Sequence, residues 1–217
     1  MVVNMSIEAR RSAFEEALAN VHVTAHTEPG FFDHVDDPIA ALAHAQKELR
    51  AQAIDDLANS SVDPKHVAGL NEIVLHENHI DGSTGLKGKY VPDDSALHYQ
   101  HNTPKVYTVL AHELGHHALN HRPLDQLPED LSDEDLLSYT GRKEAEADHF
   151  SNQNALGTNN YVHAAIHHVN DSCTKSHGSW SHQFLKHIGS GYLDTMKEIN
   201  PGLHQQLLNN TEIGNTP

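Results

Sequence analysis

Positively charged side chains are scarce in this sequence. Its 217 residues include 14 Lys and Arg against 30 Asp and Glu, so the formal net charge is -16 with the histidines neutral. Because phosphate contacts need clustered Lys and Arg, this balance argues against a nucleic-acid-binding protein. It argues equally against docking on an anionic lipid surface.

Cysteine and long apolar runs are rare as well. The single cysteine, Cys173, can form no intrachain disulfide and cannot build a zinc site from several thiolates. No stretch approaches the ~18 apolar residues of a membrane span, and the N-terminus MVVNMSIEARR lacks the apolar core of a signal peptide. We therefore expect a cytoplasmic protein with no membrane span, while export by another route stays open.

Histidine, by contrast, is abundant, with 21 residues in the chain. Several histidine pairs are spaced four residues apart, but so many histidines produce such pairs by chance. Most of them are expected to be solvated surface imidazoles. Together they change the net charge steeply between about pH 7 and pH 5.

The hydrophobic periodicity and the turn residues predict helices first, then a small sheet, then helices again. The predicted helices cover residues 6–20, 38–59, 105–121, 142–154, 159–170, 180–188 and 191–209, and the predicted strands cover 70–76, 89–91 and 95–100. Asp37 and Thr103 are expected N-caps because each precedes a proline, whereas Gly141 is expected to interrupt the helical pattern before Arg142. This order predicts an α+β domain whose sheet has three antiparallel strands.

Residues 111–121, AHELGHHALNH, contain the pattern H-E-x-x-H. On a helix, His112 and His116 lie one turn apart on one face, so their imidazoles can bind a single Zn²⁺. Glu113 is rotated by about 100° from His112 and can reach a water at the metal without ligating it, which is the place of a general base. Gly115 is expected to let another backbone element pack closely, at a helix-propensity cost of about 1 kcal/mol.

Three features of the surrounding sequence favour a metal site over two surface histidines. The flanks VYTVLA and AL are apolar, so the helix is expected to be at least half buried. A predicted strand precedes the helix, as an enzyme that holds an extended peptide by edge pairing requires. A segment rich in carboxylates, residues 142–150, follows it.

Two motifs, H-E-x-G-H-x-x-x-x-H at residues 112–121 and E-x-x-A-D at residues 144–148, resemble the gluzincin clan of zinc metallopeptidases. HtpX-like and BepA-like peptidases share both motifs, although Gly178 here replaces their usual proline and the membrane helices are absent. The compact ImmA/IrrE-like peptidases are also similar, but they usually carry E-x-x-A-N. The resemblance covers about residues 70–190.

The resemblance implies a mostly helical zincin-like fold with the small sheet beside the H-E-x-x-H helix. It implies that Glu144 is the third zinc ligand, with the fourth position left to water. Asp148, one turn further on, would orient a ligand imidazole. Glu146 is two residues from Glu144 and is therefore expected to face packing or solvent.

The residue that would stabilise the oxyanion stays open among Tyr161, His177 and His182. Two further histidines lie next to the motif. We predict His117 and His121 to be flank or surface positions, and His121 to cap the helix C-terminus as a cation.

These patterns together predict a zinc-dependent metalloendopeptidase with one catalytic Zn²⁺ and a protein or peptide substrate. Residues 1–60 are expected to form an N-terminal helical segment and residues 61–217 the metallopeptidase domain, in one compact unit. The acidic stretch 129–135 would either solvate a connection or favour basic substrates. The alternative is a catalytically silent zinc-binding interaction module, or a virion or accessory structural module, of the same fold.

Overall fold

The computed structural model describes residues 5–26, 38–77, 80, 87–104, 106–154 and 182–210. The helices are α1 (Ile7–Ala17), α2 (Pro38–Asn59), α3 (Val106–Ala118), α4 (Asp133–Asn154), α6 (His182–Ile199) and α7 (Pro201–Asn210), with short 3-10 turns η1 (Pro64–Val67) and η2 (Leu124–Gln126). The strands are β1 (His22–His26), β2 (Glu72–His76), β3 (Gly88–Val91) and β4 (Ala96–Gln100). The fold is mixed α/β and mostly helical.

The sheet differs from the prediction, because it has four strands and is not purely antiparallel. Its order is β1-β2-β4-β3, and only β3 runs antiparallel to its neighbour. Strand β1 was not predicted, because it buries only Val23 and so shows no alternating apolar pattern. Parallel pairing of β1 with β2 needs a long crossover, and α2 lies in the connection between them.

One face of the sheet forms the main hydrophobic core. Alternate strand residues such as Val23, Ile73 and Leu97 point to this face and pack against α1, α2 and α3. Phe14 of α1 and Leu18, the residue that caps this helix, are fully buried in the same cluster. The first 60 residues, which we expected to form a helical segment, also supply the strand β1 and share this core with β2, β4 and α3.

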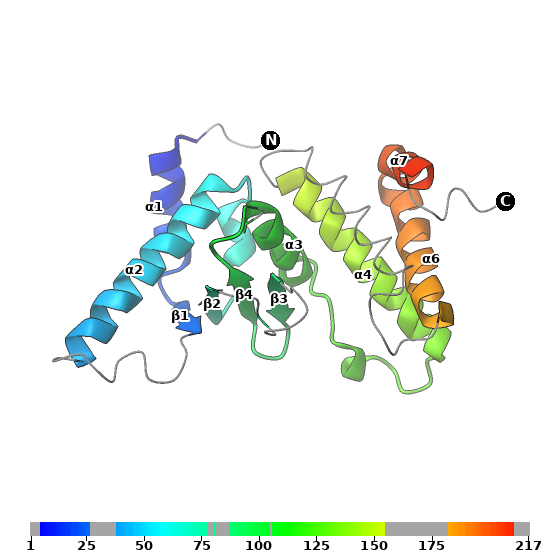
Figure 1. The fold of residues 1–217 in the computed structure, drawn as a ribbon, viewed down its shortest axis with the longest axis horizontal. Helices are drawn as coiled ribbons and strands as arrows, with labels where there is room; N and C mark the ends of the chain where they lie inside the picture. The colour runs from blue at the N-terminus through cyan, green and yellow to red at the C-terminus, as the bar shows by residue number, and fades with distance from the viewer. Residues whose placement is uncertain are drawn as a thin grey trace.

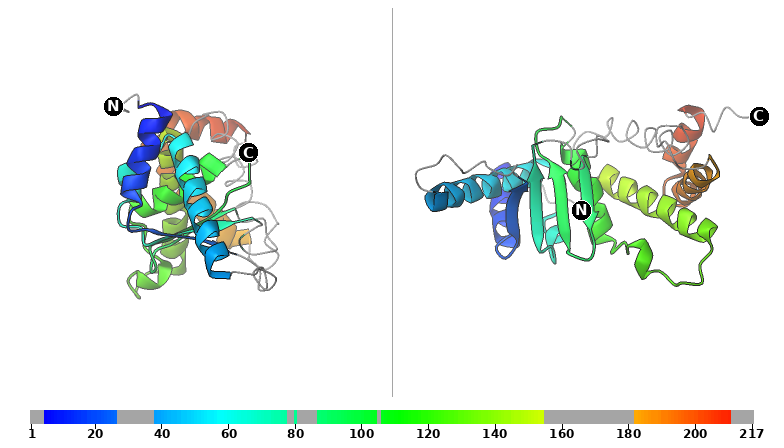
Figure 2. Two further views of the ribbon diagram at one scale, coloured as in Figure 1. Left: turned by 90° about the vertical axis from the view of Figure 1, so that its left-hand side faces the viewer. Right: turned by 60° about the horizontal axis from the view of Figure 1, so that its bottom comes forward.

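The helices α4, α6 and α7 form a second packed region. Its buried cluster includes Ala145 of α4, Met196 of α6 and Leu207 of α7. Figure 1 shows the sheet and α3 in the middle, with α1 and α2 on one side and these three helices on the other. The right-hand view in Figure 2 shows the same order, and α3 contacts both the sheet and α4.

Helix α4 is one continuous helix, so the predicted break at Gly141 is wrong. Gly141 lies buried inside α4. The helix begins with a reciprocal cap, since the Ser132 hydroxyl accepts a hydrogen bond from the Asp135 amide and donates to its carboxylate. The acidic residues 133–135 therefore form the first turn of a helix, where negative charge is stabilising.

Two other helix ends also differ from the prediction. Helix α3 ends at Ala118 instead of His121, because Asn120 adopts a positive φ of 54°. The break between the last two helices falls at Asn200, whose side chain accepts a hydrogen bond from the Leu203 amide. The expected helix 159–170 and the expected N-cap Asp37 lie outside the described residues. No described helix combines the length and the apolar character needed to cross a bilayer.

Candidate metal centre

Helix α3 presents His112 and His116 on the face that looks toward α4. Its opposite side is held on the core by Leu110 and Leu114, which are fully buried. The two imidazoles converge, and their Nε2 atoms lie 3.1 Å apart. Their side chains are only 13% and 12% exposed, so most of the surface they present is already desolvated.

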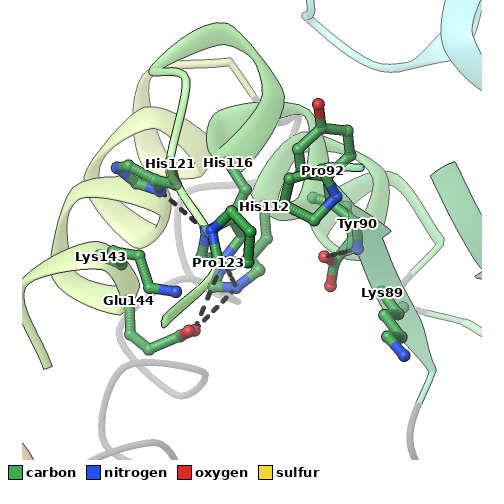
Figure 3. A pocket seen from close by; sticks show the side chains of 11 residues that line it. Lys89, Tyr90, Pro92, His112, His116, His121, Pro123, Lys143 and Glu144 are labelled. Atoms are coloured by element: carbon green, nitrogen blue, oxygen red, sulfur yellow. Dashed lines mark hydrogen bonds and ion pairs between the residues drawn. The ribbon is translucent and has the colours of Figure 1, made fainter. Parts of the chain in front are cut away.

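Helix α4 brings Glu144 to the same point (Figure 3). Its Oε2 lies 3.2 Å from Nε2 of His112 and 3.6 Å from Nε2 of His116. The approach of the two helices depends on Gly115, since a Cβ there would lie 3.0 Å from Cα of Ala147. The expectation that Gly115 admits a second backbone element is thus confirmed, and that element is α4.

The three side chains fit a zinc ion. Each offers one ligand atom, and these atoms all lie within 4.8 Å of one another. Two ligands of a tetrahedral zinc lie about 3.3 Å apart when each metal–ligand distance is about 2.0–2.1 Å. The three observed separations, between 3.1 and 3.6 Å, bracket that value. Two imidazoles and one carboxylate are also the donors that a catalytic zinc takes.

Asp148 lies behind His112. Its Oδ1 accepts a hydrogen bond of 2.8 Å from Nδ1 of His112, and its Oδ2 accepts one of 2.7 Å from the hydroxyl of Tyr192 on α6. Asp148 is buried, as is Tyr192. The sequence analysis missed Tyr192, which is 44 residues from Asp148 and carries no motif.

The charges at this point favour a cation. Burial alone lowers the pKa of His112, but the charge and the hydrogen bond of Asp148 outweigh it and raise that pKa well above its usual value. Burial alone raises the pKa of Glu144, but hydrogen bonds from His112 and His116 hold it well below its usual range. A position where two carboxylates stabilise positive charge is electrostatically suited to a divalent metal ion.

Glu113 lies outside the group of three candidate ligands but lines the same pocket. Its Oε2 accepts a hydrogen bond of 2.8 Å from the backbone N–H of Tyr90 on β3. Burial raises the pKa of this carboxyl group, and the neighbouring His112 and His116 offset only part of that effect. The close fit needs a glycine on β3, because a Cβ at Gly88 would lie 2.6 Å from Oε1 of Glu113. Neither Gly88 nor Tyr90 was identified from the sequence.

A pocket of about 370 Å³ opens in front of these groups. The candidate ligands form its inner wall, β3 forms one side, and Lys143 with Pro123 lies opposite. Lys143 donates a long hydrogen bond of 3.4 Å to the backbone carbonyl of Arg122, and burial lowers its pKa. The sequence analysis did not single out this ammonium group.

His121 is not a surface residue, so that prediction is wrong. It is buried, its Nδ1 lies 2.8 Å from Nδ1 of His116, and its Nε2 lies 3.0 Å from Oε2 of Glu146. Burial lowers the pKa of His121 to about 4, so it is neutral at pH 7 and does not cap the helix as a cation. Glu146, which we expected to face packing or solvent, instead contacts this imidazole.

His117 lies on the flank of α3, about 100° around the helix from His116. Its Nε2 donates to the backbone carbonyl of Ala68, and its Nδ1 lies 3.0 Å from the hydroxyl of Tyr90. It thereby ties α3 to η1 and β3 rather than adding to the metal group.

The three candidates for oxyanion stabilisation are not placed by the structure. Tyr161 and His177 lie outside the described residues. His182 is the first residue of α6, and only its backbone is described.

The chain was also compared with known proteins. No family model, no curated protein and no solved structure matches it.

Proposed function

We propose that this protein is a zinc-dependent metalloendopeptidase. The observation that carries the proposal is the convergence of His112, His116 and Glu144 on one point, with the Glu113 carboxylate beside it but outside the ligand set. Three ligands leave a coordination position open, which distinguishes a catalytic zinc site from a structural one. A purely structural zinc site would not need a carboxylate such as that of Glu113 beside the open position.

The two histidines and Glu144 would hold the ion. A zinc ion in such a site supplies Lewis acidity to a water and to the carbonyl of the scissile bond. Glu113 is the general base that removes a proton from the attacking water and passes it to the leaving amine.

The edge strand β3 supports a peptide as the substrate. One side of β3 pairs with β4, while Gly88 and Tyr90 line the pocket on its other side. An extended peptide can add to such an edge through backbone hydrogen bonds, which recognise a main chain rather than a particular side chain. A pocket that lies beside both an edge strand and the candidate metal site supports a peptide as the substrate.

The test is proteolysis of a peptide library derived from a whole proteome, with the metal content of the purified full chain measured in parallel. We expect one zinc per chain and cleavage that a chelator abolishes and added zinc restores. The Glu113→Gln variant is the control for a contaminating protease. Stoichiometric zinc without cleavage of any library peptide would instead support the catalytically silent zinc-binding module.

A further inference from the structure

The imidazole of His116 has a second partner on the side away from the candidate metal position. Its Nε2 points toward His112 and Glu144, while its Nδ1 lies 2.8 Å from Nδ1 of His121 (Figure 3). The imidazole of His121 in turn reaches Oε2 of Glu146. The proposed function assigns no role to His121 or Glu146.

The end of α3 places His121 behind His116. The N–H of His121 donates to the carbonyl of His116 at 3.0 Å, and the N–H of Asn120 donates to the carbonyl of His117. With Asn120 at a φ of 54°, this is the pattern in which a left-handed residue turns the chain back over the last helical turn. A residue five positions after His116 thus returns beneath it.

The hydrogen bonds in the chain can run in only one direction when His116 binds a metal. Arg142 donates to Oε1 of Glu146 at 2.8 Å, which keeps this group a carboxylate that only accepts. Nε2 of His121 must therefore carry a proton and donate it to Oε2 of Glu146. If Nε2 of His116 gives its lone pair to a metal, its proton is on Nδ1 and is donated to Nδ1 of His121.

The geometry does not suggest a second metal site around His121. The guanidinium of Arg142 already occupies the carboxylate of Glu146. Among the described residues, the one group of ligand atoms that converges on a common point is His112, His116 and Glu144. These side chains therefore form a line of hydrogen bonds from His116 through His121 to Glu146, which ends at the guanidinium of Arg142.

We propose that His121 and Glu146 position His116, by holding its imidazole in the orientation and tautomer that present Nε2 to the metal. The proposal rests on the metal centre of the proposed function. Each of the two ligand imidazoles is then oriented by a carboxylate of α4. Asp148 contacts His112 directly, and Glu146 acts on His116 through His121. Groups that orient a metal-bound histidine in this way typically change metal affinity about 10–100-fold.

The experiment measures zinc affinity of the full chain by competition with a chromophoric chelator. His121→Phe keeps a ring in the buried position but removes both hydrogen bonds, and we expect zinc to bind about 10–100-fold more weakly. His121→Gln can still accept from His116 and donate to Glu146, so it should recover most of the affinity. The matched control is His44→Phe, because His44 is an exposed histidine that also contacts a glutamate, Glu48.

A spectroscopic measurement tests the hydrogen bond itself. In the zinc-loaded chain, ¹⁵N NMR should show a coupling across the hydrogen bond between the two Nδ1 atoms, and a purely space-filling His121 would not give it. Should His121→Phe fail to fold, Glu146→Ala serves instead, since its side chain is 26% exposed and its loss should weaken zinc binding several-fold.

The two proposals fail in different ways. If the wild type binds zinc but His121→Phe and Glu146→Ala bind it as tightly as His44→Phe does, the positioning role is refuted and the metal centre stands. If the wild type binds no stoichiometric zinc, the metal centre is refuted and this inference with it.

Discussion

At the scale of single residues, the site separates groups that would hold a metal from a group that would move a proton. His112, His116 and Glu144 point at one another, whereas the carboxylate of Glu113 is held to the side by the Tyr90 amide. Substitutions at these positions should therefore affect metal content and turnover differently.

The first prediction concerns Glu113. Glu113→Gln keeps the size of the side chain but removes the base, so turnover should fall by about two to four orders of magnitude. Zinc content should stay at one per chain, because this side chain is outside the ligand set. Metal analysis and peptide cleavage of the purified variant measure both, with the exposed Glu129→Gln as control. Near wild-type cleavage by Glu113→Gln would refute the mechanism.

The second prediction compares two carboxylates of α4. Glu144→Ala removes a ligand, so the purified variant should contain no zinc or should bind it too weakly to detect. Asp148→Asn leaves the ligands in place but weakens the hydrogen bond from His112, so zinc affinity should fall by about 10–100-fold. Zinc titration of both variants decides the order. The assignment of roles along this helix is wrong if Asp148→Asn loses the metal and Glu144→Ala retains it.

At the scale of secondary-structure elements, the site depends on how closely β3 and α4 approach α3. Gly115 permits the contact with α4, and Gly88 permits the contact between β3 and the side chains of α3. A methyl group in either place would push the elements apart, because protein interiors leave few voids to absorb it.

The third prediction uses Gly88. In Gly88→Ala the new Cβ would lie 2.5 Å from Cγ1 of Val109 and 2.6 Å from Oε1 of Glu113, so the Glu113 carboxylate must move. We expect turnover to fall about tenfold or more while zinc stays bound, since none of the three ligands is touched. Kinetics and metal analysis check this.

The control for that prediction is a glycine with room around it. At Gly202 of α7, the nearest atom to a new Cβ would be Oδ1 of Asn200 at 3.8 Å. Gly202→Ala should therefore leave cleavage and zinc unchanged. Equal activity of the two variants would show that the fit of β3 against Glu113 has no role in catalysis.

At the scale of the whole molecule, the two faces of the sheet differ in character. The covered face is apolar, whereas the other carries the imidazoles of His26, His76 and His98 on three neighbouring strands. His76 lies between the other two, with ring centroids at 5.2 Å from His26 and 5.4 Å from His98. Its Nε2 lies 3.1 Å from Nδ1 of His98, and only 5% of the residue is exposed.

The fourth prediction is a pH dependence of stability that arises at His76. Burial, together with the nearby His98 and His26, lowers its pKa from 6.5 to about 4. Between these values the unfolded chain binds a proton that the folded chain refuses, so the free energy of unfolding falls as the pH drops through this range. The loss due to His76 should be about 1–3 kcal/mol.

Denaturant unfolding between pH 7 and pH 4 measures this loss, with a chelator present so that metal release adds nothing. His76→Gln cannot titrate and should show a smaller decrease in stability than the wild type over this range. His44→Gln, which replaces an exposed histidine of α2, should follow the wild type. If His76→Gln and the wild type lose the same free energy, His76 is not the group responsible.

The sequence alone predicted those features that depend on residues close together in the chain. Helical spacing put His112 and His116 on one face, and Pro38 lies where α2 begins, as its place after Asp37 predicted. Strands β2, β3 and β4 were located because apolar residues between turn residues are a local pattern. The mostly helical, mixed α/β class followed from the same signals.

Only the tertiary structure decided which distant segments meet. Alternation shows which face of a strand is apolar but not which strand lies beside it, so the parallel pairings and β1 could not be predicted. Gly141 lies buried within a continuous helix, and no local pattern distinguishes such a glycine from one that ends a helix. His121, Tyr90 and Tyr192 reach the site through a helix cap, an edge strand and a packed helix, respectively. Their contacts depend on the approach of elements that only the complete fold brings together.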